Sequence, residues 1–199
     1  MAQGHVPDEI LVVDDGSTDD LGGVLAQCPG PIRQLRQENQ GSAAATNLGM
    51  NAVTNRYVAT LDSDDLWAPG KIEAQLDVLL EIGPLACVFT RAESFGDEEL
   101  TAGVDDSKSG WGRSTLMTHM DVWELVGPMN RFPGDRGDNA DWIARAREAG
   151  VQCHMIEQFL AKRRLRPGSL SFQRDPEADR GYLKMMHQAI LRKRQAQGQ

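Results

Sequence analysis

The sequence is poor in cysteine, in aromatic side chains and in long apolar runs. Its three cysteines, Cys28, Cys87 and Cys153, lie far apart without CxxC spacing. This excludes a cysteine-based zinc site and a disulfide framework, and we expect each to be a small buried side chain. No apolar stretch approaches the roughly 20 residues that span a bilayer, and the first residues lack signal-peptide character. We therefore expect a soluble cytoplasmic protein and leave peripheral membrane association open.

Basic residues are outnumbered by acidic ones. The 199 residues include 21 Lys and Arg against 29 Asp and Glu, and the formal net charge is −8. This balance argues against binding to nucleic-acid backbones, which needs clustered Lys and Arg. The basic residues that are present gather late in the chain, at 162–166 and at 192–194. An acidic protein that binds a nucleotide therefore needs a metal ion or local basic side chains.

Short apolar runs alternate with amphipathic or alanine-rich segments. We expect a short helix ending near residue 28, strands at 9–14, 32–36, 57–61, 85–89, 151–156 and 159–162, and helices at 41–53, 69–82, 138–149 and 182–194. Residues 116–126 fit either a strand or a helix, and residues 96–113 are expected to form a mobile loop. This order predicts an α/β fold with a mainly parallel sheet covered by helices on both faces.

Two of the predicted strands end in clustered carboxylates. Asp14 and Asp15 follow the first strand, while Asp62, Asp64 and Asp65 follow the strand at 57–61. Ionised groups are rarely buried without a partner, and ligands of such sheets bind at the carboxyl ends of the strands. Asp62 and Asp64, two residues apart, point the same way in an extended chain and could bind Mg²⁺ or Mn²⁺. The alternative for these acidic residues is that they cap a helix.

The turn after the first strand allows two interpretations. Asp14 and Asp15 could accept hydrogen bonds from a ribose or a base, while the amides of Gly16 and Ser17 favour an anion. Alternatively, Gly16 and Ser17 form a tight turn and a helix cap without any ligand. That alternative does not explain two consecutive aspartates.

The stretch Pro7–Asp19 (PDEILVVDDGSTD) resembles the second strand and turn of family 2 glycosyltransferases with the GT-A fold. Residues 38–49 resemble that family's glycine-and-asparagine helix start, residues 61–67 its DXD metal motif, and residues 126–128 and 138–145 later segments in the same order. The resemblance implies one GT-A-like, Rossmann-type α/β domain. Its parts would be a nucleotide-sugar-binding half (1–95), an acceptor and catalytic half (96–175) and a C-terminal helix (176–199). In the family a strand and a helix precede the matching segment, so we expect an N-terminally truncated domain lacking about 30 residues, one β-α unit.

The resemblance also implies a function. The chain would be a metal-dependent glycosyltransferase that moves a sugar from a nucleotide-sugar, expected to be UDP-linked as in UDP-glucose, to an unidentified acceptor (a glycan, lipid, small molecule or peptide). The donor would bind at Asp14, Asp15, Gly16, Ser17, Gly41, Asn47, Asp62, Asp65 and Arg166, and Mg²⁺ or Mn²⁺ at Asp62 and Asp64. The guanidinium group of Arg166 could clamp phosphate.

An inverting transfer needs a base for the acceptor's proton. The family's acidic pair falls on Asp138 and Asn139, and the amide of Asn139 cannot serve. Asp138 and Asp141 share a helix face, and we favour Asp141 as the base. The alternative for both is a favourable interaction with the helix dipole. Asn139 and the absent first strand also motivate a second function, a catalytically impaired nucleotide-sugar-binding or scaffold protein of the same fold.

Overall fold

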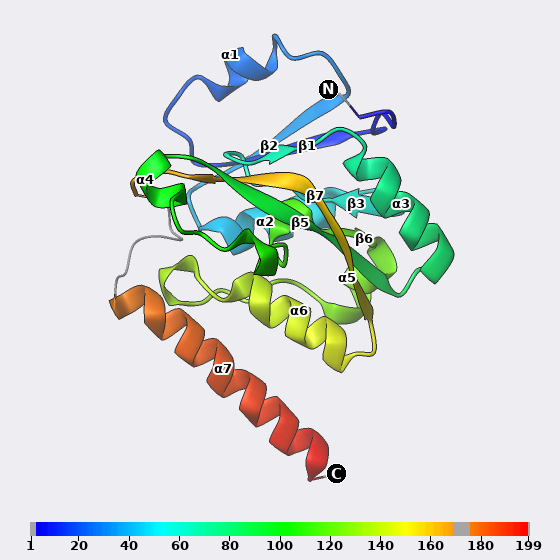
Figure 1. The fold of residues 1–199 in the computed structure, drawn as a ribbon, viewed down its shortest axis with the longest axis vertical. Coiled ribbons are helices and arrows are strands. Elements are labelled where there is room, and N and C mark those ends of the chain that lie inside the picture. The colour runs from blue at the N-terminus through cyan, green and yellow to red at the C-terminus, as the bar shows by residue number, and fades with distance from the viewer. Residues whose placement is uncertain (1–2, 169–175, 199) are drawn as a thin grey trace.

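The structure is a computed structural model that describes residues 3–168 and 176–198 (Figure 1). The strands are β1 (Ile10–Asp15), β2 (Ile32–Gln37), β3 (Tyr57–Ala59), β4 (Leu66–Trp67), β5 (Ala86–Gly96), β6 (Met117–His119) and β7 (Gln152–Leu165). The helices are α1 (Leu21–Leu25), α2 (Ser42–Ala52), α3 (Lys71–Ile82), α4 (Glu98–Thr101), α5 (Met120–Val126), α6 (Asp138–Glu148) and α7 (Pro176–Gln197). Short 3₁₀ helices are η1 (Asp106–Lys108), η2 (Arg113–Thr115) and η3 (Pro133–Asp135). The predicted boundary at residue 175 lies outside the described residues.

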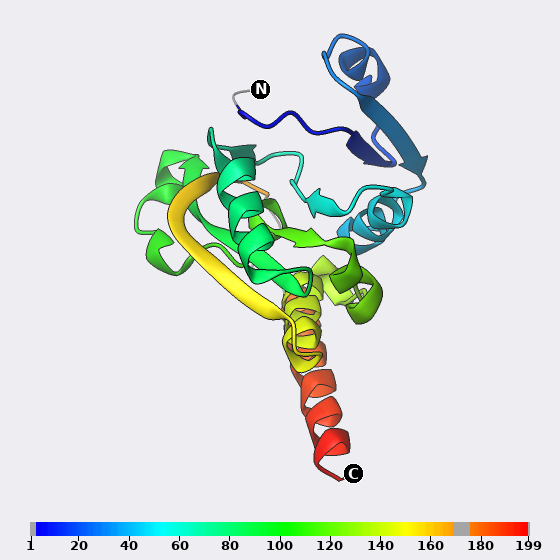
Figure 2. The same cartoon turned by 90° about the vertical axis from the view of Figure 1, so that its right-hand side faces the viewer.

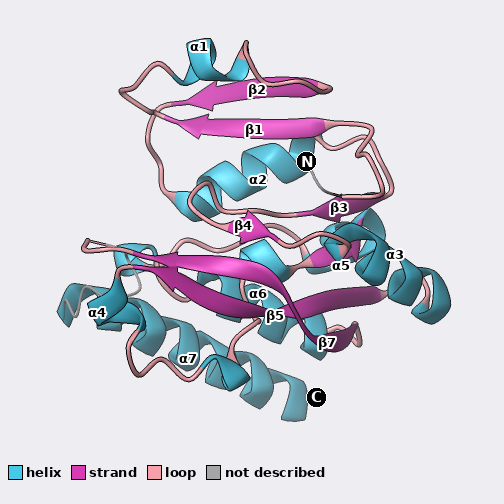
Figure 3. Ribbon diagram, turned by 45° about the horizontal axis from the view of Figure 1, so that its top comes forward, coloured by secondary structure: helices cyan, strands magenta, loops and turns pink. Residues whose placement is uncertain are grey.

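The strands form two sheets, which Figure 3 shows one above the other. β1 and β2 pair in parallel, and the larger sheet has the order β3-β6-β5-β7-β4. Its longest ladder, between β5 and β7, is parallel, whereas β6 and β4 pair antiparallel to their neighbours over two or three residues. The predicted α/β fold with mostly parallel pairing is confirmed. The larger sheet is mixed because β6 runs back along the start of β5, where Cys87 pairs with Thr118 and Val88 with Met117.

Strand β5 shows why both faces of the larger sheet are covered. Its buried run alternates, so Cys87 and Phe89 join one apolar cluster and Ala86 and Val88 join another. The first cluster is built with side chains from α2, α5 and α6, and the second with Leu79 of α3. Helices on both faces were predicted from the alternation of strands and helices, and the two clusters confirm them.

Several segments differ from the sequence-based expectation. Residues 116–126 contain both a strand, β6, and a helix, α5, which explains their mixed pattern. The mobile loop predicted at 96–113 is wrong, because α4 and η1 pack beside an extended β5. The carboxylate of Asp106 accepts hydrogen bonds from the amide and hydroxyl of Ser94, at 2.8 and 2.7 Å. Cys28 is exposed rather than buried, whereas Cys87 is buried and Cys153 is partly buried.

The C-terminal helix α7 projects from the body of the molecule (Figure 2). Its first turns lie against η3 and α6, and its last turns extend beyond them. No helix in the described parts of the chain is long and apolar enough to cross a membrane.

Candidate functional site

The turn after β1 is locked by its first aspartate. The carboxylate of Asp14 is buried and accepts hydrogen bonds from the amide of Ser17 and from the guanidinium of Arg36, both at 2.7 Å, with Gln34 at 3.3 Å. The hydrogen bond from Ser17 is the main reason that the pKa of Asp14 lies below its ordinary value. Asp14 therefore fixes the position of the turn and of Ser17.

Asp15 connects this turn to the start of α2. Its carboxylate accepts hydrogen bonds from the side chain of Gln37 at 2.6 Å and from the amides of Gln40 and Gly41 at 2.9 and 2.8 Å. Burial raises the pKa of Asp15, but these three hydrogen bonds outweigh it and hold the pKa below its ordinary value. Three donors converging on one carboxylate thus join the end of β1 to α2.

Two glycines allow the close packing of these segments. Gly16 has a φ of +81°, and a Cβ there would lie 2.8 Å from the backbone nitrogen of Asn39. Gly41 has a φ of +88°, and a Cβ there would lie 2.5 Å from the Asp135 carboxylate. Any larger residue would be strained at either position and would push the segments apart. Both predicted glycines therefore have a structural role that the geometry defines.

The second acidic cluster is organised around Ser114. The Ser114 hydroxyl donates to Asp65 at 2.6 Å and accepts from the amide of Asp62 at 3.0 Å, and the Ser114 carbonyl accepts from the indole of Trp67 at 2.7 Å. Asp65 is buried and also accepts from the amide of Arg164 at 2.9 Å. Burial raises the pKa of Asp65. Asp65 therefore anchors the motif to β7 rather than pointing outward.

Asp62 and Asp64 remain accessible. Their side chains are 42% and 37% exposed, and each has an arginine nearby. Arg113 Nε lies 3.0 Å from Asp62, and Arg166 Nε lies 3.8 Å from Asp64. Within residues 3–168 and 176–198 no group of three or more His, Cys, Asp or Glu side chains could hold a metal ion. Two accessible carboxylates do fit the way Mg²⁺ is commonly held, by one or two protein carboxylates together with substrate phosphates.

Arg113 links this cluster to the predicted catalytic helix. Its Nη1 atom lies 2.6 Å from the carboxylate of Asp138, and its Nε atom contacts Asp62. Burial lowers the pKa of the Arg113 guanidinium, but the two carboxylates outweigh this and raise it, so it stays charged. No sequence pattern indicated Arg113, because this residue lies at the end of a segment that was predicted to be a mobile loop.

Asp138 also contacts the start of α2. The Ser42 hydroxyl lies 3.4 Å from the Asp138 carboxylate. Because Ser42 follows Gly41, contacts run without a break from Asp15 to Asp138 and then through Arg113 to Asp62. The two acidic clusters predicted from strand ends are thus joined at one side of the molecule.

The favoured base, Asp141, is not part of this arrangement. It is fully buried and is held by Asn130, Arg145 and Arg192, each at 2.9 Å. Because its carboxylate lies between two arginines of the helix layer, it has no access to an acceptor. Asp138 is also largely buried, with 7% of its side chain exposed, but it shares Arg113 with Asp62, so its position favours Asp138 over Asp141.

Asn47 also differs from the expectation. Its side-chain amide donates to the carbonyl of Met129 at 3.0 Å, and its side-chain carbonyl accepts from the Met129 amide at 2.8 Å. This reciprocal pair uses the end of the side chain to join α2 to the segment after α5. Asn47 thus joins two segments of the fold in this structure, and its side chain does not face the site predicted for the nucleotide-sugar.

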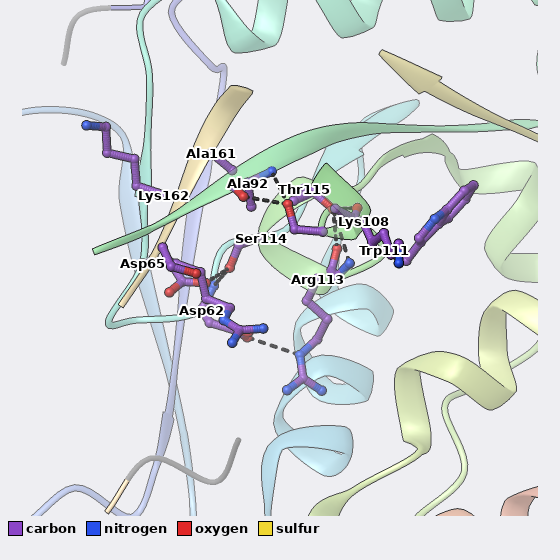
Figure 4. Close-up of a pocket in the computed structure, with 15 residues that line it drawn as sticks. Asp62, Asp65, Ala92, Lys108, Trp111, Arg113, Ser114, Thr115, Ala161 and Lys162 are labelled. Atoms are coloured by element: carbon purple, nitrogen blue, oxygen red, sulfur yellow. Dashed lines mark hydrogen bonds and ion pairs between the residues drawn. The ribbon is translucent and has the colours of Figure 1, made fainter. Parts of the chain in front are cut away.

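A pocket of about 290 Å³ lies beside this arrangement (Figure 4). It is bounded by Asp62 and Asp65, by the 108–115 segment and by the ends of β5 and β7. Figure 4 shows Asp62 and Arg113 pointing toward each other at its rim. A second, open hollow of about 500 Å³ lies by the first turn and is lined by Gly16, Arg36, Gln37, Glu38 and Asn39.

Comparison with known proteins gives the family of the chain. The family model described as glycosyl transferase family 2 matches residues 1–133, most of the 199 residues. An uncharacterized glycosyltransferase of Rickettsia felis is 45% identical over 83 residues, which are 41% of this chain and 14% of that protein. Chondroitin synthase of Escherichia coli is 37% identical over 86 residues, 41% of this chain and 12% of that protein. The chain thus spans only a small part of the length of these relatives.

The fold also matches solved structures. S. aureus TarS 1–349 in complex with UDP-GlcNAc superimposes with a TM-score of 0.71 at 13% identity, covering 92% of this chain and 56% of that chain. The TarS structure in complex with UDP gives a TM-score of 0.65 at 14% identity over 83% of this chain and 54% of that chain. At such low identity the match concerns the fold alone. Together with the family model, it shows that the chain belongs to glycosyl transferase family 2 and has the GT-A-like α/β fold.

Proposed function

We propose that this chain transfers a sugar from a nucleotide-sugar to an acceptor, with inversion at the sugar carbon and dependence on a divalent cation. The observation that carries the proposal is the position of Arg113, which contacts both Asp62 and Asp138 beside a pocket of about 290 Å³. A carboxylate that can face a cation and a carboxylate that can accept a proton are thereby held next to one another. These are the two groups that such a transfer requires.

The donor is expected to be UDP-linked, as are the ligands of the TarS structures. The open hollow next to Gly16 offers the nucleoside several polar groups, including the side chains of Gln37 and Asn39. In this proposal Asp14 and Asp15 act through their hydrogen bonds, because they hold the turn and the start of α2 in place. The diphosphate would then lie toward Asp62 and Asp64.

Asp62 and Asp64 would hold Mg²⁺ or Mn²⁺. The cation would neutralise charge that builds up on the leaving diphosphate. In this structure Arg113 and Arg166 provide the positive charge beside these carboxylates. Guanidinium groups also pair well with phosphate oxygens, so both arginines are suited to contact the bound diphosphate.

Asp138 is the proposed base. It is the first residue of α6, and contacts from Arg113 and Ser42 orient its carboxylate. Because Arg113 also contacts Asp62, the base is held close to the expected position of the sugar diphosphate. A carboxylate so placed can take the proton of an acceptor bound beside Arg113.

The test compares turnover of wild type with that of Asp64→Asn. Wild type should release UDP from UDP-glucose or UDP-GlcNAc in the presence of Mn²⁺. Asp64→Asn should lose this activity by about 100-fold or more, the scale expected when an electrostatic contact to the transition state is removed. Asp77→Asn, an exposed change on α3, is the matched control. Equal rates for wild type and Asp64→Asn would contradict the proposal.

A second function is favoured by one specific observation at Asn139. Its side chain donates to the carbonyl of Trp111 at 2.6 Å and has no group that can take a proton. A protein that binds nucleotide-sugar without transferring it is consistent with this residue. Calorimetric binding of UDP with no release of UDP from UDP-sugars under any metal condition would support that function over transfer.

A further inference from the structure

The outward side of α7 carries a continuous apolar stripe. Leu183, Met186 and Ile190 are 61%, 48% and 51% exposed, and Tyr182 beside them is 44% exposed. At 3.6 residues per turn these four side chains fall within an arc of about 100° on the helix. Large apolar side chains gathered in this way on a helix surface are typical of a contact surface.

The opposite side of α7 fixes the orientation of that stripe. A side chain at Gly181 would clash with the main-chain carbonyl of Pro133, so the helix packs tightly against η3 there. Farther along, Arg192 pairs with Asp141 at 2.9 Å and with Glu148 at 2.8 Å. These contacts hold the inward side on α6 and leave the apolar stripe turned away from the body.

The charge of this helix is opposite to that of the protein. From Arg180 to Gln197 the sequence contains five Lys and Arg and no Asp or Glu, although the chain as a whole has a net charge of −8. By helical spacing Lys193 lies within the apolar stripe and Arg194 lies at its edge, whereas Lys184 lies outside it. Among the described residues, Lys184, Lys193 and Arg194 have no carboxylate partner. Their positive charge is therefore available to an external anion.

We propose that the outward face of α7 binds the surface of an anionic lipid bilayer. Its apolar side chains would enter the boundary between headgroups and acyl chains, and its Lys and Arg side chains would contact lipid phosphates. The tyrosine ring suits the same boundary, since it is apolar with a polar tip. Figure 2 shows α7 extending beyond the rest of the molecule, so it can reach a surface while the acidic body stays away.

The charge pattern argues against a second copy of the same helix as the occupant. Two α7 helices packed face to face would place Lys193 and Arg194 of both copies at the interface, with no acidic residue after Arg180 to compensate. Like charges at a helix interface are unfavourable, whereas helix pairs usually place opposite charges beside the apolar seam. The surface of an anionic bilayer offers an apolar boundary to the apolar side chains and phosphate groups to the basic side chains.

The proposal is tested by cosedimentation of the full chain with vesicles. Vesicles of phosphatidylcholine and phosphatidylglycerol in equal parts should bind the wild type, and vesicles of phosphatidylcholine alone should bind it several-fold less. Added salt should weaken binding to the mixed vesicles. Lys193→Gln with Arg194→Gln should reduce it by about tenfold or more, because each basic residue near an anionic surface contributes several-fold to affinity.

Exposed apolar residues provide a matched pair of variants. Leu183→Glu with Ile190→Glu should abolish binding to the mixed vesicles, whereas Leu80→Glu, at a leucine of α3 that is 62% exposed, should leave it unchanged. Equal binding to both vesicle types, or unchanged binding of the Leu183→Glu and Ile190→Glu variant, would overturn the proposal. So would sedimentation as a dimer that this double variant converts to a monomer. The experiment does not depend on sugar transfer, so it stands apart from the proposed function.

Discussion

The guanidinium of Arg113 lies 2.6 Å from the carboxylate of Asp138, although the two residues are 25 positions apart in the chain. Arg113 comes from the segment before β6, and Asp138 begins α6. The side chain of Arg113 is 15% exposed and that of Asp138 is 7% exposed, so the pair is largely shielded from water. Such a pair is more sensitive to the loss of one partner than a surface ion pair is.

Replacing Arg113 should therefore affect both stability and turnover. In Arg113→Ala, Asp62 and Asp138 lose the cation between them, and a largely buried carboxylate is left without its partner. We expect a loss of about 3 kcal/mol in the free energy of unfolding, measured by urea denaturation, and a fall in UDP release of about tenfold or more. Arg56→Gln, an exposed arginine change, is the control. Unchanged stability and turnover in Arg113→Ala would show that the bridge has no role.

We expect replacement of Asp138 to reduce sugar transfer and replacement of Asp141 to reduce the stability of the fold. Asp138→Asn keeps the size of the side chain and leaves Arg113 paired with Asp62, so UDP binding should persist while sugar transfer falls by about 100-fold. Asp141→Asn should instead destabilise the fold by about 3 kcal/mol, because Arg145 and Arg192 lose a buried carboxylate. Urea denaturation and UDP release on both variants separate the two effects. Loss of transfer in a stable Asp141→Asn protein would reinstate Asp141 as the base.

Asp15 should make stability depend on pH in the acid range. The pKa of its carboxylate is lower in the folded protein than its ordinary value of 3.8. Its hydrogen bonds therefore stabilise the fold above that value, and the stabilisation is lost as the pH falls through the folded pKa. The difference in unfolding free energy between wild type and Asp15→Asn should be constant at neutral pH and shrink in acid. Urea denaturation of both proteins at a series of pH values measures this difference.

Lys71 should make stability rise with pH on the alkaline side. It is fully buried, with its Nζ atom 2.5 Å from the side-chain oxygen of Gln75 and 4.3 Å from the centre of the Trp67 ring. Burial lowers its pKa from 10.5 to about 7. Between these two values the unfolded chain binds a proton that the folded chain does not, so stability should rise with pH.

The variant Lys71→Met tests this alkaline rise. The wild type should gain at most about 1.4 kcal/mol per pH unit relative to Lys71→Met across the window from about 7 to 10.5. Urea denaturation at a series of pH values measures the difference between the two proteins. A constant difference across the window would show that Lys71 keeps its ordinary pKa in the folded state.

Local sequence was sufficient for much of the fold. The apolar run before Asp14, the spacing of Leu76 and Leu79 in α3 and the start of α6 at Asp138 were all predicted, because each depends on periodicity or capping within a few residues. The pairing of β6 was not predicted, because the 116–126 segment changes from strand to helix within one apolar run. The packing of residues 96–113 was also missed, since it depends on Asp106 reaching Ser94 from another part of the chain.

The sequence by itself determined the family, most of the longer strands and helices, and the two acidic clusters at strand ends, because these are encoded in contiguous residues. Only the tertiary structure decided what each carboxylate contacts. Asp14, Asp65 and Asp141 are enclosed by hydrogen-bond donors, whereas Asp62 and Asp64 remain accessible and Asp138 meets Arg113. The reason is that burial and ion pairing of a side chain depend on which distant segments pack against it, and no local pattern specifies those contacts.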